Sequence, residues 1–173
     1  LKDFIKVCEE NNLTWFGDAG SGIGALRHKG FIPWDDDIDV VLPRKDFNKM
    51  IEVFKRDYSD KYSIANVETM ENYPLMTTRL MLKGTKFVEE PLKNLKCELG
   101  IFLDIYPYDN IPDSDEELKE IVDFYDYLEI QPIGNNAYMK TDSKHPMVNT
   151  DEDLQNLNRR IVALGEKYNK PVV

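Results

Sequence analysis

The sequence lacks an apolar run of bilayer length, and it contains only two cysteines and two histidines in 173 residues. A chain without such a run is not expected to cross a membrane, and its first residues lack the basic and apolar blocks of a secretory signal. Cys8 and Cys97 show neither CxxC nor Cys/His spacing, which argues against a disulfide scaffold or a zinc site. We therefore expect a cytoplasmic protein with buried, reduced thiols, associated with the cytoplasmic membrane face at most peripherally.

Positive charge is scarce, because 22 Lys and Arg residues face 32 Asp and Glu residues and give a net charge of −10. This balance would repel nucleic-acid phosphates, so no nucleic-acid partner is expected. Hydrophobic residues at 42% and charged residues at 31% are typical of a globular protein, and the length suits one domain. An acidic chain can still bind an anionic substrate when its carboxylates hold a bridging cation.

Apolar periodicity predicts an α+β fold, in which a small mixed sheet carries acids at its strand ends and helices pack on one side. Helical spacing predicts helices at about 1–10, 47–54, 118–125 and 154–168. Shorter apolar runs predict strands at 13–16, 38–42, 62–66, 77–83, 85–88, 100–106 and 127–131. Gly84 is expected to form a hairpin turn, and Pro107 to close the strand before it. A further helix is expected from a Ser21 cap to about His28.

Four acids fall within five positions at 35–39, at the mouth of an apolar strand. Alternate side chains of a strand share a face, so Asp37 and Asp39 are expected to point the same way while Ile38 and Val40 enter the core. Like charges held so close favour a cation between them, and Mg²⁺ or Mn²⁺ suits carboxylate ligands. An EF-hand fails because Val40 stands where the loop requires glycine. A solvated acidic loop is the remaining alternative.

Two short motifs upstream are candidates for phosphate binding. Gly20 and Ser21 lie at the predicted start of a helix, whose N-terminal amides could bind phosphate, with a flexible turn as the alternative. Arg27, His28 and Lys29 form a compact basic group in an otherwise acidic chain. This group suits a phosphate and suits pairing with the acids equally well.

The stretch 27–39, which reads RHKGFIPWDDDID, resembles, together with the Gly20-Ser21 step, the signature of the LicD family. This family lies within the nucleotidyltransferase superfamily of the polymerase beta type, and the resemblance covers roughly residues 1–120. The LicD family includes bacterial phosphocholine transferases that act on teichoic acid or lipopolysaccharide, and fukutin-related enzymes that transfer ribitol phosphate. The resemblance implies a nucleotidyltransferase-like fold and a metal-dependent transfer of a phospho-alcohol from a CDP-linked donor to a glycan hydroxyl.

The same resemblance implies roles for three acids. Asp37 and Asp39 match the family's metal ligands, and Asp104, within the later strand GIFLDIYP, matches its strand-borne acid. Asp104 is thereby implied as the third ligand or as the base that takes the acceptor proton. A strand-end aspartate that caps the following turn is the alternative for Asp104.

Three basic residues are candidates for contact with the donor. Arg44 and Arg79 could bind the donor phosphates, or could be surface ion-pair residues. His28 is not expected to be catalytic, because the cation and the acid of the later strand already supply what phosphoryl transfer needs. We expect His28 to orient its loop or to touch phosphate.

From about residue 122 onward the sequence resembles part of the PHP domain of PolC, the Gram-positive replicative DNA polymerase, so the chain looks chimeric. Glu129 aligns with an acid at the end of a PHP strand, but the His-rich motifs of such sites are missing. We therefore divide the chain into a LicD-like domain at 1–121 and a strand-helix-strand segment at 122–173. That segment is expected to pack on the same core.

Three functions remain to be separated. A LicD-like phosphotransferase predicts cation-dependent binding of a CDP-alcohol that is lost when Asp37 or Asp39 becomes Asn. A non-catalytic nucleotide- or metal-binding scaffold predicts binding without turnover. A fragment related to DNA polymerase III predicts tight DNA binding at physiological salt, against which the acidic charge argues.

Overall fold

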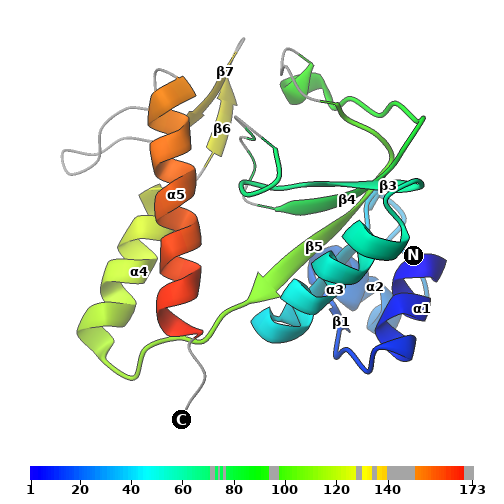
Figure 1. Cartoon of the computed structure of the whole chain (residues 1–173), viewed down its shortest axis with the longest axis horizontal. Helices are drawn as coiled ribbons and strands as arrows, with labels where there is room; N and C mark the ends of the chain where they lie inside the picture. Colours follow the sequence, from blue (N-terminus) through cyan, green and yellow to red (C-terminus); the bar gives the residue numbers. More distant parts are fainter. Residues whose placement is uncertain are drawn as a thin grey trace.

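The computed structural model describes residues 1–70, 73, 75, 77–93, 98–127, 130–133, 136–139 and 151–169. A five-stranded mixed sheet in the order β1-β2-β5-β4-β3 organises the fold (Figure 1). Its strands are β1 Phe16–Gly17, β2 Asp39–Pro43, β3 Tyr62–Ala65, β4 Thr78–Leu82 and β5 Phe102–Tyr108. β2 and β5 run parallel, and the other pairs are antiparallel. The predicted α+β fold with a small mixed sheet is therefore confirmed.

Two helices, α1 Lys2–Glu10 and α3 Arg44–Asp57, supply the main core against one face of this sheet. Their apolar residues recur at helical spacing, which gathers Phe4 and Val7 of α1 beside Phe47 and Met50 of α3. The sheet contributes the side chains that alternate inward from its central strands, such as the fully buried Ile105. The core thereby fixes the register of β2 and β5, on which the candidate site depends.

Cys8 lies in this core, and burial raises the pKa of its thiol to about 12. A thiol of such high pKa stays protonated and unreactive at neutral pH. The expectation of a buried, reduced cysteine is confirmed for Cys8. Cys97 lies outside the described residues.

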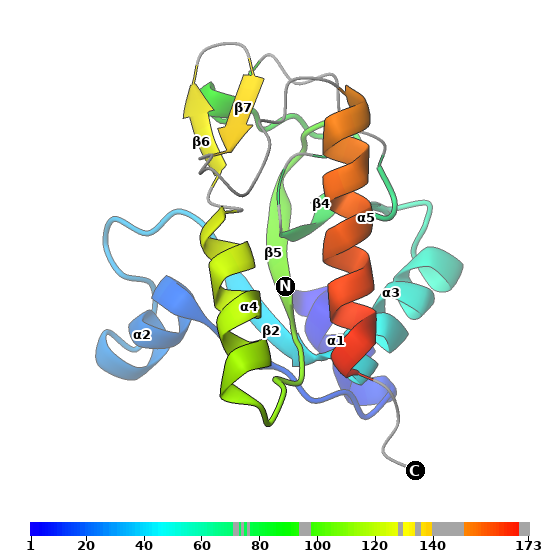
Figure 2. The same cartoon turned by 90° about the vertical axis from the view of Figure 1, so that its left-hand side faces the viewer.

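Helix α2, Ala19–Arg27, stands out to one side of the sheet together with the loop that follows it (Figure 2). The expected Ser21 cap is wrong, because the helix already begins at Ala19 and Asp18 occupies the N-cap position. Two glycines explain how closely the helix packs. A Cβ at Gly24 would lie 2.5 Å from the carbonyl oxygen of Gly30, and one at Gly22 would lie 2.9 Å from that of Gly17.

Two expected strands differ from the structure. The run at 13–16 forms only the two-residue strand β1, because the N–H groups of Leu13 and Thr14 donate to the carbonyl oxygen of Cys8 and to the carboxylate of Asp46 and not to a strand. Residues 85–88 form no strand, so the predicted hairpin partner is wrong. Gly84 does make a turn, with φ at 75°. The hydroxyl of Thr85 then donates to one backbone carbonyl and accepts from the N–H of Ile101, which replaces a regular ladder.

Pro107 lies inside β5 and does not end it as expected. Its neighbour on one side is Leu42 of β2, while the pairing of β4 with β5 extends only to Thr78 opposite Ile105. The missing N–H of proline therefore falls where one side of the strand has no partner from β4. Proline is tolerated in a strand at such a position.

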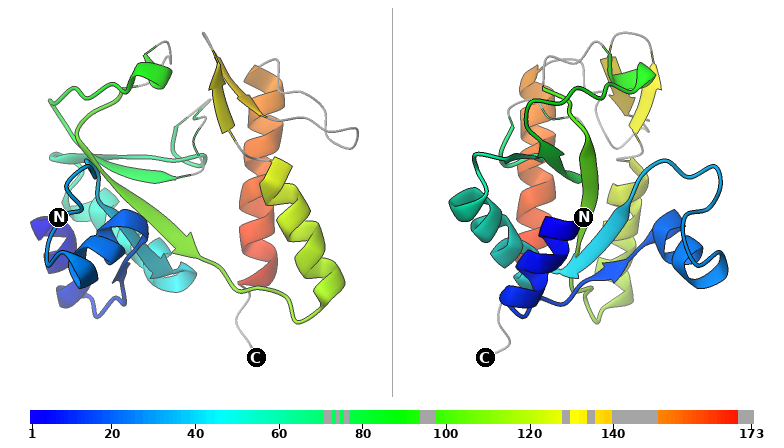
Figure 3. Two further views of the ribbon diagram at one scale, coloured as in Figure 1. Left: turned by 180° about the vertical axis from the view of Figure 1, so that it is seen from behind. Right: turned by 90° about the vertical axis from the view of Figure 1, so that its right-hand side faces the viewer.

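The C-terminal part contains α4 Asp115–Tyr127, the hairpin β6 Ile130–Ile133 and β7 Asn136–Met139, and α5 Asp151–Tyr168 (Figure 3). A short 3-10 helix, η1 Glu90–Leu92, precedes β5. The strand expected at 127–131 is partly wrong, since Tyr127 ends α4 and the strand begins at Ile130. Glu129 and the final residues 172–173 lie outside the described residues.

Two asparagines, one in helix α5 and one just after it, form hydrogen bonds with other parts of the chain, and Leu157 of α5 is buried. Asn158 donates to the carbonyl oxygen of Tyr73 at 3.1 Å, and Asn169 donates to Asp109 at 2.6 Å. These contacts reach the segments that flank the sheet, and no side chain of α5 belongs to the core cluster under α1 and α3. The division at residue 121 stays a prediction.

Candidate functional site

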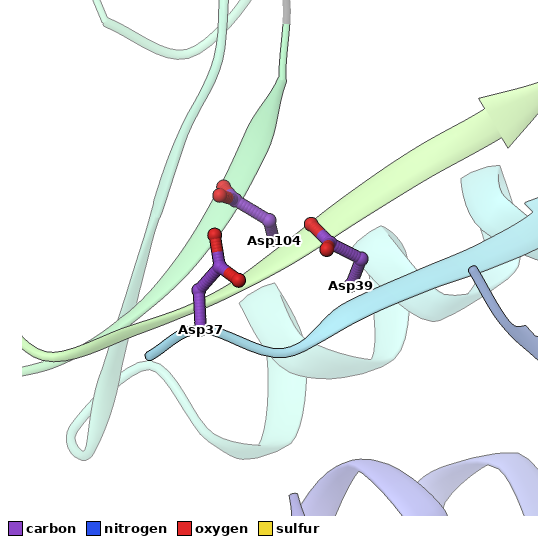
Figure 4. Close-up of side chains that lie close together, drawn as sticks. All are labelled: Asp37, Asp39 and Asp104. Carbon is purple, nitrogen blue, oxygen red and sulfur yellow. The ribbon is translucent and has the colours of Figure 1, made fainter. Parts of the chain in front are cut away.

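Three aspartates, from β5, from β2 and from the bend just before β2, meet on the face of the sheet opposite the α1 and α3 core (Figure 4). Asp37 lies on the bend just before β2, Asp39 is the first residue of β2, and Asp104 is on β5. One carboxylate oxygen from each lies within 4.8 Å of the other two. The structure thus brings together the three acids that the sequence proposed as metal ligands.

The local sequence explains this convergence. Val40 is fully buried in the core and Ile38 packs against it, so the alternation of β2 turns Asp37 and Asp39 to the opposite face, as expected. Parallel pairing sets Asp39 directly opposite Asp104. The backbone N–H of Asp104 also donates to the carbonyl oxygen of Ile38 at 3.1 Å, which fixes the register beside the three acids.

Burial and mutual repulsion disfavour the charged forms of all three acids. Burial first, and then the charges of Asp37 and Asp104, raise the pKa of Asp39 to about 6. The pKa of Asp37 is raised by burial and by the neighbouring acids Asp35 and Asp36. Burial also raises the pKa of Asp104, although Arg79 opposes the shift. A divalent cation would relieve this repulsion.

The chemistry of the donor set fits Mg²⁺ or Mn²⁺. Both are hard cations that prefer oxygen ligands and bind with few carboxylates. Asp39 and Asp104 are buried and Asp37 is partly exposed, so the group opens to solvent on one side only. Among the residues that the structure describes, this is the one cluster of at least three acids, histidines or cysteines with such spacing.

Arg79, the candidate phosphate ligand on β4, is buried and bound to one member of the cluster. Its Nε donates to Oδ1 of Asp104 at 3.2 Å, and its Nη1 donates to Glu89 at 2.6 Å. The hydroxyl of Thr77 donates to the same Oδ1 at 3.2 Å. Sequence reasoning missed Thr77 and Glu89, because neither belongs to a motif and both reach the site only through folding.

Tyr106 also borders the cluster without having been predicted. Burial raises the pKa of its hydroxyl, and the charges of Asp104 and Asp39 raise it further. The phenol therefore stays protonated at any physiological pH. Tyr106 lies two residues after Asp104 on β5, so the two side chains share a face. Strand alternation could therefore have predicted that Tyr106 borders the site.

The Gly20-Ser21 step contacts two aspartates of the 35–39 stretch. The hydroxyl of Ser21 accepts a 2.9 Å hydrogen bond from the backbone N–H of Asp39. Gly20 lies against the side chain of Asp35, whose carboxylate a Cβ at this position would overlap. The Oδ2 atom of Asp35 is buried and has no hydrogen-bond partner among the described residues. Phosphate binding by Gly20 and Ser21 stays a prediction.

The remaining basic candidates are not brought to the three acids by any contact between described residues. Arg27 ends α2 and its Nε lies 3.4 Å from Nδ1 of the adjacent His28, with both side chains exposed. Arg44 begins α3 at the far end of β2 from Asp39, and it makes a bidentate ion pair with Asp109 at 2.6 and 2.7 Å. Their roles in phosphate binding stay predictions.

No helix within the described part of the chain is both long and apolar enough to cross a membrane.

Comparison with known proteins gives one family and several relatives. The family profile described as "LicD/FKTN/FKRP, nucleotidyltransferase domain" matches residues 12–122. The lipopolysaccharide cholinephosphotransferase LicD of Haemophilus influenzae is 33% identical over 114 residues, which are 66% of this chain and 42% of that protein. No solved structure matches the chain.

A further group of relatives consists of PolC-type DNA polymerases III. The enzyme of Caldanaerobacter subterraneus is 48% identical over 60 residues, which are 35% of this chain and 4% of that protein. That of Clostridium perfringens is 36% identical over 111 residues, 64% of this chain and 7% of that protein. Both matches are longer than segment 122–173, so the polymerase similarity extends into the residues that the family profile covers. The chain spans less than half of the first relative and under a tenth of these two.

Proposed function

Because this chain belongs to the LicD/FKTN/FKRP family of nucleotidyltransferase domains, we propose that it is a divalent-cation-dependent phosphotransferase. It moves a phospho-alcohol, phosphocholine or a similar group, from a CDP-linked donor to a hydroxyl of a cell-surface glycan. The observation that carries this proposal is the convergence of Asp37, Asp39 and Asp104 within 4.8 Å. The Haemophilus relative, named for transfer of phosphocholine to lipopolysaccharide, supports the class of reaction, and teichoic acid is a second candidate acceptor.

In this proposal the three aspartates hold Mg²⁺ or Mn²⁺. When bound, such a cation neutralises phosphate charge and polarises the phosphoryl oxygen. The acceptor hydroxyl attacks the phosphorus that carries the alcohol, the bond from that phosphorus to CMP breaks, and CMP leaves. The buried Asp39 and Asp104 stay in place through the reaction, because backbone pairing and the hydrogen bond from Ser21 hold their strands.

Asp104 is either the third ligand or the base that takes the acceptor proton, and the substitution Asp104→Asn separates these roles. Loss of a ligand weakens binding of Mn²⁺ in the absence of donor. Loss of a base leaves Mn²⁺ binding intact and removes turnover. We place the reaction in the cytoplasm, with peripheral contact to the membrane face as the route to a glycan acceptor.

The decisive test is a calorimetric titration of CDP-choline and CDP-ribitol into the protein with Mg²⁺, repeated with EDTA and with Asp39→Asn. Asp36→Asn is the matched control, because Asp36 is an exposed neighbour that carries the same charge and lies outside the cluster. We expect saturable heat that requires both the cation and Asp39, and that survives in the control. Absence of heat with either donor, from a folded protein, would reject the donor site.

The two alternative functions give different results in companion assays. A non-catalytic scaffold binds the donor but transfers no label from CDP-choline to lipopolysaccharide or teichoic acid. A polymerase-related fragment binds DNA at physiological salt, which the net charge of −10 opposes. Transfer of label without DNA binding supports the proposed function over both.

A further inference from the structure

The guanidinium of Arg79 has three partners. Nε donates to Asp104, Nη1 donates to Glu89, and the guanidinium carbon lies 3.7 Å from the centre of the Phe102 ring. The side chain is buried, with a relative exposure of 7%. An arginine that turned toward a donor phosphate would lose two charge-assisted hydrogen bonds and a cation-π contact at once.

The contacts of Asp104 show what this arrangement accomplishes. Thr77 and Arg79 both donate to Oδ1 of Asp104, at 3.2 Å each, and Oδ2 receives neither bond. Two donors on one oxygen set the rotation of the carboxylate about its Cβ–Cγ bond. Oδ1 is thereby bound to the protein, and Oδ2 is left without either of these two bonds.

Glu89 and Phe102 hold Arg79 in turn. Arg79 stands directly opposite Asp104 in the pairing of β4 with β5, and Phe102 is two residues before Asp104 on the same face. Glu89 comes from the loop after β4 and balances the second edge of the guanidinium. The planar guanidinium fork of arginine donates hydrogen bonds to two carboxylates in different, fixed directions. The ammonium group of lysine is a point charge and does not reproduce this geometry.

We propose that Arg79 is a positioning residue that orients Asp104 for cation binding, with Thr77 as its partner, and that it is not a ligand of the donor phosphates. This inference rests on the proposed function, because it takes Asp104 to act beside a bound cation. It reverses the role that the sequence suggested for Arg79. It also assigns a role to Thr77, to which no motif points.

The experiment measures Mn²⁺ binding by the donor-free protein, using the electron paramagnetic resonance signal of free Mn²⁺. The informative variants are Thr77→Val, which removes only the hydroxyl bond, and Arg79→Lys, which keeps the charge but loses the fork. We expect each to weaken Mn²⁺ binding about fivefold, the scale of one lost hydrogen bond. Thr14→Val and Arg56→Lys are matched controls, because both residues are exposed and neither touches the cluster.

The readout separates a positioning role from a phosphate contact. Loss of a phosphate ligand raises the KM for CDP-choline and leaves donor-free Mn²⁺ binding unchanged, whereas a misplaced Asp104 weakens Mn²⁺ binding and lowers kcat. If both variants bind Mn²⁺ like the wild type, the positioning proposal is overturned. Thermal melting of each variant identifies an unfolded protein, and Thr77→Val, with a half-buried site, keeps the test open if Arg79→Lys fails to fold.

Asp39→Asn distinguishes failure of this inference from failure of the proposed function. If the wild type binds no Mn²⁺, or if Asp39→Asn binds it equally well, the cation site itself is rejected. If Mn²⁺ binding depends on Asp39 but not on Thr77 or Arg79, the proposed function stands and the positioning role falls.

Discussion

The hydroxyl of Ser21 and the backbone N–H of Asp39 form a 2.9 Å hydrogen bond that ties helix α2 to the first residue of β2. Because Asp39 is 93% buried, at 7% relative exposure, its N–H has no ready replacement partner in water. Ser21 therefore fixes the backbone from which a proposed cation ligand projects. In this way Ser21 helps to position the carboxylate of Asp39.

The first prediction concerns this bond. Ser21→Ala is expected to leave the N–H of Asp39 unpaired, which should lower the free energy of unfolding by about 1–3 kcal/mol. Mn²⁺ binding should weaken as well, because the start of β2 loses its anchor. Urea unfolding and Mn²⁺ titration measure the two effects, with the exposed Ser59→Ala as control. Unchanged stability and unchanged Mn²⁺ affinity would contradict the anchoring role.

The three acids of this site could be predicted from the sequence, whereas their hydrogen-bond partners could not, for a physical reason. Asp37 and Asp39 follow from strand alternation and Asp104 from the family resemblance, because all three depend on local pattern. The partners of those acids come from elsewhere in the chain. Arg79 reaches Asp104 through the pairing of β4 with β5, and Ser21 reaches Asp39 through packing of a protruding helix. Such tertiary contacts leave no periodic signal in one sequence.

Prediction of the helices and strands from the sequence fails for the same reason. The long helices and central strands were predicted because their apolar spacing is regular, whereas residues 85–88 carry apolar side chains without forming a strand. There the hydroxyl of Thr85 bonds to the carbonyl oxygen of Leu82, which a hairpin ladder would need, and the N–H of Phe87 donates to Leu99 and not to β4. Whether a side-chain hydroxyl or a backbone N–H bonds to such a carbonyl depends on the segments that pack beside it, which the local sequence does not specify.

The second prediction concerns Gly20 and Asp35. Replacing a helical glycine with alanine usually stabilises a helix by up to about 1 kcal/mol, but a Cβ at Gly20 would overlap the carboxylate of Asp35. We therefore expect Gly20→Ala to destabilise the protein, and Asp35→Ala to reverse the sign of that change. A double-mutant cycle by urea unfolding measures the coupling. Additive effects of the two substitutions would show that the glycine is not required by this contact.

The third prediction is a pH dependence of the cation-free protein. The pKa of Asp39 is raised to about 6 in the folded chain from a value of 3.8 for an ordinary aspartate. Between these values the native state binds a proton that the unfolded state releases, so this group's contribution to stability falls as pH rises from about 4 through 6. Asp37 and Asp104 shift in the same direction.

The difference between the wild type and Asp39→Asn reports the titration of Asp39 together with its coupling to Asp37 and Asp104, because groups far from these acids titrate alike in both proteins. In EDTA the variant should gain stability relative to the wild type as pH rises from 4 to 7. Urea unfolding at several pH values measures the gain. A difference that is constant with pH would contradict the raised pKa of Asp39.

The fourth prediction is a crossing of stabilities when cation is added. Removing one of three crowded charges should stabilise the cation-free protein at pH 7.5, on the order of 1–3 kcal/mol. The wild type should then overtake Asp39→Asn as Mn²⁺ is added, because only the native wild type binds the cation and gains stability from it. Thermal melting with EDTA and with increasing Mn²⁺ measures both effects. Parallel increases in the two proteins would place Mn²⁺ elsewhere.

The last prediction addresses how the C-terminal helix is held. The carboxylate of Asp109 accepts two hydrogen bonds from Arg44 at the start of α3 and one from Asn169 just after α5. Asp109→Ala removes all three and leaves Arg44, whose side chain is 24% exposed, without its partner. Because polar contacts of this kind help to hold α5 against the remainder of the chain, we expect faster amide hydrogen exchange throughout α5 and little change in the core strand β5. Asp113→Ala, at an exposed site nearby in the chain, is the control. Equal acceleration of exchange in α5 and β5 would instead mean that the segment after residue 121 unfolds together with the sheet and belongs to one cooperative unit.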